Sequence, residues 1–147
     1  QSLDLLRDTV YNIRPRDQLG VEYFQQIIDD FQFCPVKFSP RGDIASLTAA
    51  QTETLASIVK EALTNASRHS RATQVEVQLE VRGKIVRLYF RDNGVGSAKI
   101  HEGMGLIGMR ERARNAGGTI SFNPEGGFQI VCVLPRDKQG KNLAGGW

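Results

Sequence analysis

Apolar residues recur along the chain at two spacings, one typical of helices and the other of strands. The helical spacing predicts four helices, over residues 2–12, 21–33, 48–66 and 106–116. The third is the clearest, and Thr48 and Gln51 have the spacing of a capping box at its start. Gly117 and Gly118 are suited to end the fourth.

Strict alternation of apolar and polar residues marks the strands. Residues 74–81 alternate, a turn at 82–84 reverses the chain, and residues 85–90 return as a second strand. Residues 119–122 and 128–134 form a closing hairpin, and residues 35–38 form a short strand before a loop at 39–47. This order indicates an α/β (α+β) two-layer sandwich, with a mixed, mostly antiparallel sheet and helices packed on one face.

Length and composition fit one globular domain. The chain has 147 residues, of which 40% are hydrophobic and 24% are charged, and this composition excludes wholesale disorder. No apolar run approaches the roughly 20 residues of a membrane-spanning helix, and the start shows no signal-peptide pattern. Because the chain begins with Gln1 close to a predicted helix, we expect a fragment of a longer protein, whose membrane anchor would lie upstream.

The distribution of charge and the two cysteines limit the kinds of ligand and site that the chain can have. Residues 1–50 carry five basic and seven acidic side chains, whereas residues 51–147 carry 14 basic and nine acidic ones, so the second half suits an anionic ligand. Its basic residues are scattered, so we expect no direct binding of nucleic acid. Cys34 and Cys132 form no CxxC motif, which favours a reduced intracellular protein and argues against a disulfide scaffold or a zinc site.

The first candidate site lies on the third predicted helix. Glu61, Asn65 and Arg68 are spaced four and three residues apart, which places them on one side of a helix, beside its apolar arc. Oxygen ligands hold Mg²⁺ and a guanidinium pairs with phosphate, so this line of groups suits a metal–phosphate complex. The alternative is an ordinary solvent-facing stripe.

The second candidate is the sequence Asp92-Asn-Gly-Val-Gly96. The period of two along the preceding strand places Asp92 on its apolar face. A buried carboxylate needs a fixed hydrogen-bond donor, supplied by the protein or by a ligand such as the exocyclic amine of a purine. Gly94 and Gly96 would let the backbone turn tightly and approach that ligand. The alternative is an Asx turn that closes the strand.

The third candidate is the glycine-rich run from Gly103 to Met109, where a predicted helix begins. Glycines followed by a helix expose backbone N–H groups at a positive helix end, which suits phosphate. The run also matches GxGxxG, but we reject a dinucleotide-binding unit because the run follows a loop and no βαβ unit surrounds it. Simple loop flexibility is the alternative.

Together, in this order, the three motifs resemble the sequence boxes of the GHKL ATPase superfamily. Glu61-Ala-Leu-Thr-Asn65-Ala-Ser-Arg68-His69 is similar to its N box, Asp92-Asn-Gly-Val-Gly96 to its G1 box, and Gly103–Met109 to its G2 box. The continuation into Arg110-Glu-Arg-Ala113 and Gly117-Gly-Thr119 looks like the catalytic ATP-binding domain of sensor histidine kinases with short ATP lids, which are paired with response regulators bearing helix-turn-helix domains. The resemblance covers about residues 17–135 and implies the Bergerat ATP-binding fold.

The resemblance implies ATP and Mg²⁺ as ligands. It implies that Asn65 coordinates Mg²⁺, that Asp92 accepts a hydrogen bond from the adenine amine, and that Glu61 polarises or completes the Mg²⁺ shell. Glu61 and Asn65 would be the catalytic residues, and residues 97–102 would form a short lid. The implied ATP-contacting residues are Asn65, Arg68, His69, Asp92, Gly94, Val95, Gly96, Gly103, Met104, Gly105, Leu106 and Thr119.

Two features depart from the family pattern. Family members commonly have a Gly-Thr pair before the last strand, where this chain has Gly127-Phe128, so no hydroxyl contact is expected from that position. The phosphoacceptor histidine is also missing. The chain has only His69 and His101, and His101 lies in the predicted lid, whereas the family's acceptor lies on a dimerisation helix.

The resemblance also implies an organisation and a function. Residues 1–15 would end a dimerisation and phosphoacceptor helix, residues 17–135 would form the GHKL domain, and residues 136–147 would form a flexible tail. The domain would transfer the γ-phosphoryl group of ATP to a histidine on the upstream helix, for relay to a response-regulator aspartate in two-component signalling. The full-length protein would be a homodimer anchored in the bacterial cell membrane, with this domain in the cytoplasm.

Two alternatives stay open. One is another GHKL enzyme, such as an anti-sigma-factor serine kinase or a hydrolytic ATPase. The other is a catalytically silent docking module that keeps only the fold.

Overall fold

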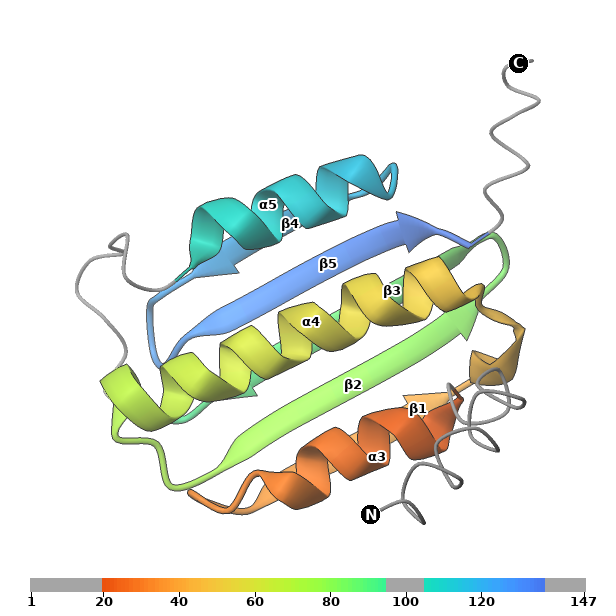
Figure 1. The fold of residues 1–147 in the computed structure, drawn as a ribbon. Coiled ribbons are helices and arrows are strands. Elements are labelled where there is room, and N and C mark those ends of the chain that lie inside the picture. The colour runs from red at the N-terminus through yellow and green to blue at the C-terminus, as the bar shows by residue number, and fades with distance from the viewer. Residues whose placement is uncertain (1–19, 95–104, 137–147) are drawn as a thin grey trace, which may run out of the picture.

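Three helices and five strands make up the part of the chain that the computed structural model describes, residues 20–94 and 105–136 (Figure 1). In chain order the elements are α3 (Val21–Asp30), β1 (Val36–Arg41), a 3₁₀ turn (Ile44–Ser46), α4 (Ala49–Asn65) with a π-helical extension (Ala66–Ser70), β2 (Val75–Arg82), β3 (Ile85–Asp92), α5 (Leu106–Asn115), β4 (Thr119–Asn123) and β5 (Gln129–Pro135). The helix predicted over 2–12, the segment 1–15, the lid at 97–102 and residues 137–147 lie outside the described residues.

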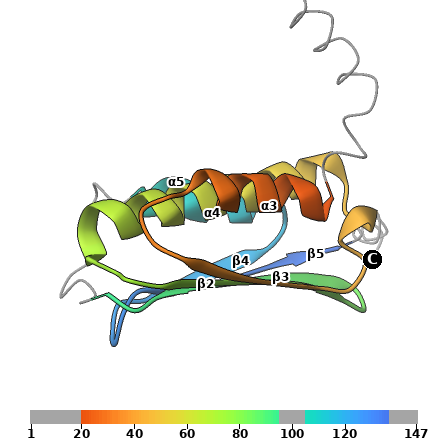
Figure 2. The same ribbon diagram turned by 90° about the horizontal axis from the view of Figure 1, so that it is seen from below.

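The strands form one mixed sheet in the order β1-β2-β3-β5-β4. β1 runs parallel to β2, whereas the β2–β3, β3–β5 and β4–β5 pairs are antiparallel. All three described helices lie on the same face of this sheet, as the view along its edge shows (Figure 2). The predicted two-layer sandwich with a mixed, mostly antiparallel sheet is therefore confirmed.

Alternation along β2 and β3 builds the core beneath α4. Every second side chain of these strands is buried on the helix-covered face, and those between them are partly or fully exposed on the other face. Each fully buried aliphatic side chain contributes roughly 1.5–3 kcal/mol to folding. The buried residues that α4, β2 and β3 contribute to this core are Leu55, Ile58, Val59, Ala62, Leu63, Val75, Val77, Leu79, Val81, Val86, Leu88 and Phe90.

Both cysteines are free thiols. Burial raises the pKa of the Cys132 thiol to about 12, so Cys132 packs as a small apolar side chain of β5. Burial, and after it the charge of Asp92, also raises the pKa of the Cys34 thiol. Neither thiol has the lowered pKa of a reactive cysteine.

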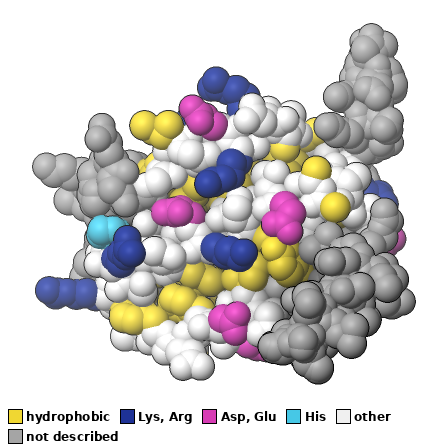
Figure 3. Space-filling view, in the orientation of Figure 1, with side chains coloured by type: hydrophobic (Ala, Val, Ile, Leu, Met, Phe, Trp, Pro, Cys, Tyr) yellow, Lys and Arg dark blue, Asp and Glu magenta, His cyan; other side chains and the backbone are white. Residues whose placement is uncertain are grey.

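On the helix-bearing face, basic and acidic side chains are interspersed rather than sorted into single-sign patches (Figure 3). Within the residues that the structure describes, no helix is long and apolar enough to cross a bilayer.

α4 begins with the predicted capping box. Thr48 Oγ1 accepts from the Gln51 N–H at 3.0 Å, and Gln51 Oε1 accepts from the Thr48 N–H at 3.0 Å. The Gln51 Nε2 group also donates to the carbonyl oxygens of Pro135 at 2.8 Å and Arg136 at 2.6 Å. Gln51 is 3% exposed, so one buried amide joins the start of α4 to the end of β5.

The first strand is longer than predicted. Ser39 and Pro40 pair with Gln78 and Leu79 of β2, so the loop predicted over 39–47 begins only after Arg41. Pro40 lacks a backbone N–H, and an edge strand such as β1 tolerates that loss. The helix predicted over 21–33 also ends three residues early, at Asp30.

Arg136, the first residue of the tail predicted over 136–147, lies within the described residues and makes three hydrogen bonds. Arg136 donates from Nη1 to the Gly83 carbonyl and from Nη2 to Ser46 Oγ, both at 3.0 Å. Its backbone N–H donates to the Lys84 carbonyl at 2.8 Å. Two of these bonds fix Arg136 against the β2–β3 turn, and the third joins it to the 3₁₀ turn.

We expect Gln51→Ala to lower the free energy of unfolding by about 2 kcal/mol, because it removes part of the cap and the amide donor to the Pro135 and Arg136 carbonyls. Chemical denaturation followed by circular dichroism measures this change. Gln25→Ala is the matched control, since the exposed Gln25 amide bonds only Asp29, one helical turn away at 2.9 Å. Its expected cost is below about 0.5 kcal/mol, and equal losses in the two variants would contradict the role assigned to Gln51.

Candidate functional site

Asp92 ends β3 with its side chain buried on the helix-covered face. It is 2% exposed, as the alternation of the strand predicted. Its Oδ1 atom accepts hydrogen bonds from the backbone N–H groups of Gly94 at 3.0 Å and Phe128 at 3.2 Å. The Asp92 N–H in turn donates to the Phe128 carbonyl at 3.0 Å. The protein therefore supplies fixed donors to this carboxylate, and the bond to Gly94 makes the Asx turn that was the alternative interpretation.

The two residues after Asp92 fasten β3 to the loop that follows α4. Asn93 Oδ1 accepts from the N–H groups of Thr73 and Gln74, both at 2.9 Å, and Asn93 Nδ2 donates to Thr73 Oγ1 at 3.0 Å. A Cβ atom on Gly94 would collide with the carbonyl oxygen of Ser70. Gly94 is thus required by the protein's own backbone, in addition to the ligand contact that the resemblance implies.

Glu61 and Asn65 lie one turn apart on α4. Asn65 ends the α-helix and is 4% exposed, while Glu61 is half-buried. The next five residues, Ala66–Ser70, form a π-helical turn that carries Arg68 and His69. Arg68 is exposed on that turn beside the half-buried His69, and its alignment with Glu61 and Asn65 stays a prediction.

α5 begins against Glu61. Its N-cap residue Gly105 has a φ of 69°, and a Cβ atom there would lie 2.6 Å from Glu61 Oε2 and 2.8 Å from Glu61 Cδ. The carboxylate thus lies beside the amino-terminal end of α5, where unpaired N–H groups and the helix dipole favour negative charge. The Leu106 side chain is buried, so Leu106 can offer a ligand only its backbone.

The motif on the second half of α4 and its extension therefore contacts both of the other predicted motifs. Its Glu61 lies against Gly105 of the glycine-rich motif, and Ser70 of its extension lies against Gly94 of the aspartate motif. Four predicted site residues cannot be placed, because Val95, Gly96, Gly103 and Met104 lie outside the described residues.

The structure does not bring Thr119 to this site. Thr119 pairs with Val133 of β5, five residues and about 17 Å along the strand from Phe128. Thr119 is exposed and alternates with the buried Ile120, so it belongs to the face of the sheet without helices. Thr119 was predicted as a site residue because Gly117-Gly-Thr119 resembles the family sequence. The register of β4 places it at the end of the sheet away from Asp92.

Phe128 is the site residue that the sequence motifs did not identify. Its contribution comes from backbone groups, which donate to and accept from Asp92. Gly127 before it has a φ of 101°, and a Cβ atom there would collide with the Asp92 carbonyl. The only sequence signal is a pair of glycines before an apolar run, and such a pair is equally typical of a plain hairpin turn.

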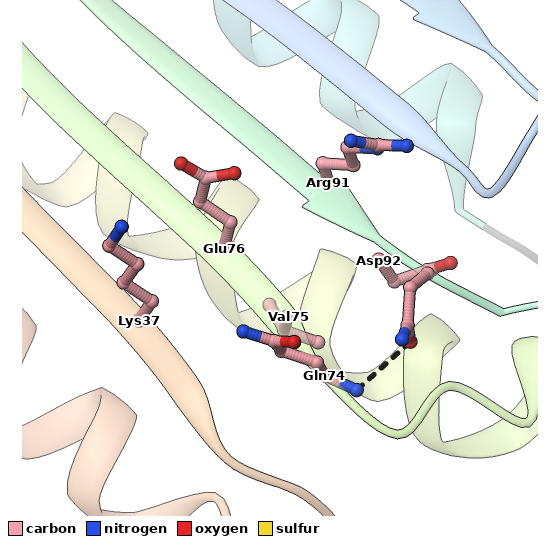
Figure 4. A pocket seen from close by; sticks show the side chains of 7 residues that line it. Lys37, Gln74, Val75, Glu76, Arg91 and Asp92 are labelled. Atoms are coloured by element: carbon pink, nitrogen blue, oxygen red, sulfur yellow. Dashed lines mark hydrogen bonds between the residues drawn. The ribbon is translucent and has the colours of Figure 1, made fainter.

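A polar hollow of about 220 Å³ opens at the same end of the sheet, on its other face (Figure 4). Lys37, Glu76 and Arg91 line it from neighbouring positions on β1, β2 and β3. They alternate along their strands with residues that the helices cover, such as Val75 and Asp92. The hollow therefore lies behind Asp92, outside the layer where Glu61, Asn65 and Gly105 meet.

Residues 50–138 match the family model described as histidine kinase-, DNA gyrase B-, and HSP90-like ATPase. The chain belongs to this ATPase family. The matched range runs from the first turn of α4 past the end of β5, so it includes Glu61, Asn65, Asp92 and Gly105. The predicted family is thereby confirmed, and the described fold is its nucleotide-binding domain.

Similar proteins include sensor kinases. The sensor histidine kinase LnrJ of Bacillus subtilis is 33% identical over 129 residues, which are 85% of this chain and 32% of LnrJ. The nitrate/nitrite sensor protein NarQ of Escherichia coli is 35% identical over 101 residues, which are 65% of this chain and 18% of NarQ. The chain thus spans a third or less of the length of these relatives.

Solved structures share the fold of this ATPase domain. The ATP binding domain of PrrB from Mycobacterium tuberculosis superposes with a TM-score of 0.63 at 23% identity, covering 82% of this chain and 93% of that one. A blue-light activated histidine kinase from Erythrobacter litoralis gives a TM-score of 0.66 at 18% identity, over 82% of this chain and 46% of that one.

Gly105→Ala tests the contact between α5 and Glu61 in this ATPase domain. Gly126→Ala is the matched control, because Gly126 has a similar φ of 66° and open space around its Cβ position. Both variants should lose roughly 1–2 kcal/mol of stability, because alanine is strained in the left-handed conformation. Gly105→Ala should cost no more than Gly126→Ala, because the end of the Glu61 side chain can move away from the added Cβ atom. Only Gly105→Ala should weaken ATP binding, by about tenfold, because it displaces the Glu61 carboxylate. Calorimetric titration measures the affinity, and equal affinities in the two variants would refute the contact's role.

Proposed function

We propose that this domain binds Mg²⁺-ATP and presents the γ-phosphoryl group to a histidine on an upstream helix of a longer protein. That protein would pass the phosphoryl group to an aspartate of a response regulator. The observation that carries the proposal is that α4, which bears Glu61 and Asn65, lies against the amino-terminal end of α5 at Gly105, while its extension lies at Ser70 against Gly94, two residues after Asp92. The sensor-kinase relatives support the choice of a histidine as acceptor.

Asp92 would recognise adenine. Both of its hydrogen bonds to the described backbone end on Oδ1, so an exocyclic amine can donate to Oδ2 without displacing either. The carboxylate cannot turn away while Gly94 and Phe128 hold it, so it is preorganised for that donor. A hydrogen bond to a charged group in a buried site favours adenine over a base that lacks the amine.

Asn65 and the start of α5 would hold the phosphates and their metal ion. The Asn65 amide oxygen and the Glu61 carboxylate are hard oxygen donors one helical turn apart, which fits Mg²⁺ when phosphates and waters complete its shell. The bound ion would neutralise charge on the phosphate oxygens. Backbone N–H groups at Gly105 and Leu106 would bind phosphate at the positive helix end, and Arg68 and His69 would lie near it.

Glu61 would serve this site without activating water. A carboxylate that deprotonated water would direct the γ-phosphoryl group to hydrolysis rather than to histidine. Its place beside Gly105 suits a polarising group or a member of the Mg²⁺ shell. Catalysis would then rest on positioning and charge neutralisation by Asn65, Glu61 and Arg68.

The partners follow from the same proposal. Residues 1–15 would end the dimerisation helix that carries the acceptor histidine upstream, and the whole protein would be a homodimer. The membrane anchor would lie in that longer protein, and this domain would work in the cytoplasm.

Asp92→Asn tests the adenine contact. The variant keeps an Oδ1 acceptor for Gly94 and Phe128 but can place a second donor opposite the adenine amine. We expect Mg²⁺-ATP affinity to fall by about 10- to 100-fold, measured by calorimetric titration. Asp43→Asn, an exposed aspartate at the 3₁₀ turn, is the control and should leave affinity unchanged. Unaltered binding by a folded Asp92→Asn protein would sink the proposal.

The same chain should bind ATP without phosphorylating itself. The family's acceptor histidine is not among the two histidines of the chain, so incubation with γ-labelled ATP should leave no acid-labile phosphate on it. Phosphohistidine on this chain would show that the acceptor is misassigned.

A further inference from the structure

An aromatic stack connects α5 to the backbone that holds Asp92. The guanidinium carbon of Arg110, on α5, lies 5.2 Å from the centroid of the Phe122 ring. Phe122, on β4, stacks on Phe128 with ring centroids 6.1 Å apart and planes 17° apart. Phe128 in turn donates its backbone N–H to Asp92 Oδ1. The sequence of contacts therefore runs from a surface arginine to a buried carboxylate.

Phe128 can act on Asp92 only through its backbone. Its side chain has no polar atom, and it is 3% exposed in the core. The bond from its N–H to Asp92 Oδ1 is 3.2 Å long, at the upper end of the usual range, so a small shift of the residue would weaken it. The Phe128 ring is stacked on Phe122, so this stack is the side-chain contact through which such a shift can be opposed.

The other end of the stack belongs to the helix that begins at the proposed phosphate site. Arg110 lies five residues after Gly105 on α5, a rise of about 7.5 Å. Gly105 contacts Glu61, whereas Arg110 contacts Phe122. One short helix thus contacts both the proposed phosphate end and, through two aromatic rings, the proposed adenine end.

We propose that Arg110, Phe122 and Phe128 form a positioning element that orients Asp92 and so sets the preference of the site for adenine. The inference rests on the proposed function, in which Asp92 reads the adenine amine. None of the three side chains is proposed to touch the nucleotide. Stacked rings are rigid and keep few alternative rotamers, and a cation over the outer ring adds to the stacking. A branched aliphatic residue would fill similar space without fixing the plane of its neighbour.

The test is the ratio of two affinities, for ATP and for inosine triphosphate, which carries a carbonyl oxygen where adenine carries its amine. The unchanged chain should prefer ATP by about tenfold or more. Phe122→Leu should reduce that ratio to about threefold or less, because the freed Phe128 backbone no longer fixes Asp92. Phe122→Tyr keeps the stack and should retain the original ratio. Arg110→Met, at an exposed position, should lower the ratio without unfolding the protein.

Two matched controls remove similar contacts elsewhere. Phe33→Leu breaks the pair of Phe31 and Phe33, whose centroids are also 6.1 Å apart. Arg87→Met breaks the contact of Arg87 with Tyr89, at 5.4 Å. Neither control should change the ratio, and thermal unfolding of every variant separates stability from selectivity.

The outcomes distinguish the inference from the function on which it rests. If Phe122→Leu and Arg110→Met weaken both nucleotides equally and keep the ratio, the stack is only structural and the inference is wrong. If the unchanged chain fails to distinguish the two nucleotides, or Asp92→Asn binds ATP normally, the adenine assignment itself fails and the inference falls with it. A lower ratio in both variants and in neither control supports it.

Discussion

A carboxylate buried at the end of a central strand is the constraint around which this end of the molecule is built. Leaving Asp92 without donors in the core would cost several kcal/mol, so the chain must bring donors to it. Those donors are backbone N–H groups, one from Gly94 in the turn that follows Asp92 and one from Phe128 at the start of the neighbouring strand. Glycine is needed beside both donors, since a Cβ on Gly94 would collide with the Ser70 carbonyl and one on Gly127 with the Asp92 carbonyl. Gly127 thus lets the Phe128 N–H reach the carboxylate, while Gly94 lets the turn after Asp92 pass close to Ser70.

α4 transmits that constraint to the rest of the fold. Its first turn is joined to the end of β5 through Gln51, and its π-helical extension receives Gly94 at Ser70. Between these ends, Glu61 lies against the start of α5. Because the middle of the helix is packed on the core of β2 and β3, these contacts are held at fixed distances. A site assembled on such a helix is preorganised, so little of the binding free energy is spent on ordering it.

Local periodicity predicted the helices, the strands and the burial of Asp92. It did not predict features that depend on long-range strand pairing or on backbone conformation. Alternation identified β2 and β3 and carried through to Asp92, and residue spacing identified the capping box of α4. The same reasoning failed where a distant partner decides the outcome. Pro40 lies in a strand because β1 is an edge strand. Residue spacing did not reveal the π-helical turn that carries Arg68, and the register of β4 separates Thr119 from the site. Phe128 was missed because motifs are read from side chains, and its contribution is a backbone N–H.

The use of a backbone donor also changes which residues can tune the site. A hydroxyl that held Asp92 could rotate to follow the carboxylate, and its influence would end at its own residue. A backbone N–H has no such freedom, so its direction is fixed by where the strand lies and by what the attached ring packs against. For Phe128 that neighbour is Phe122, and for Phe122 it is Arg110. Because Asp92 is held by a backbone N–H rather than by a side chain, its orientation depends on residues outside the site, as far as Arg110 on the surface of α5.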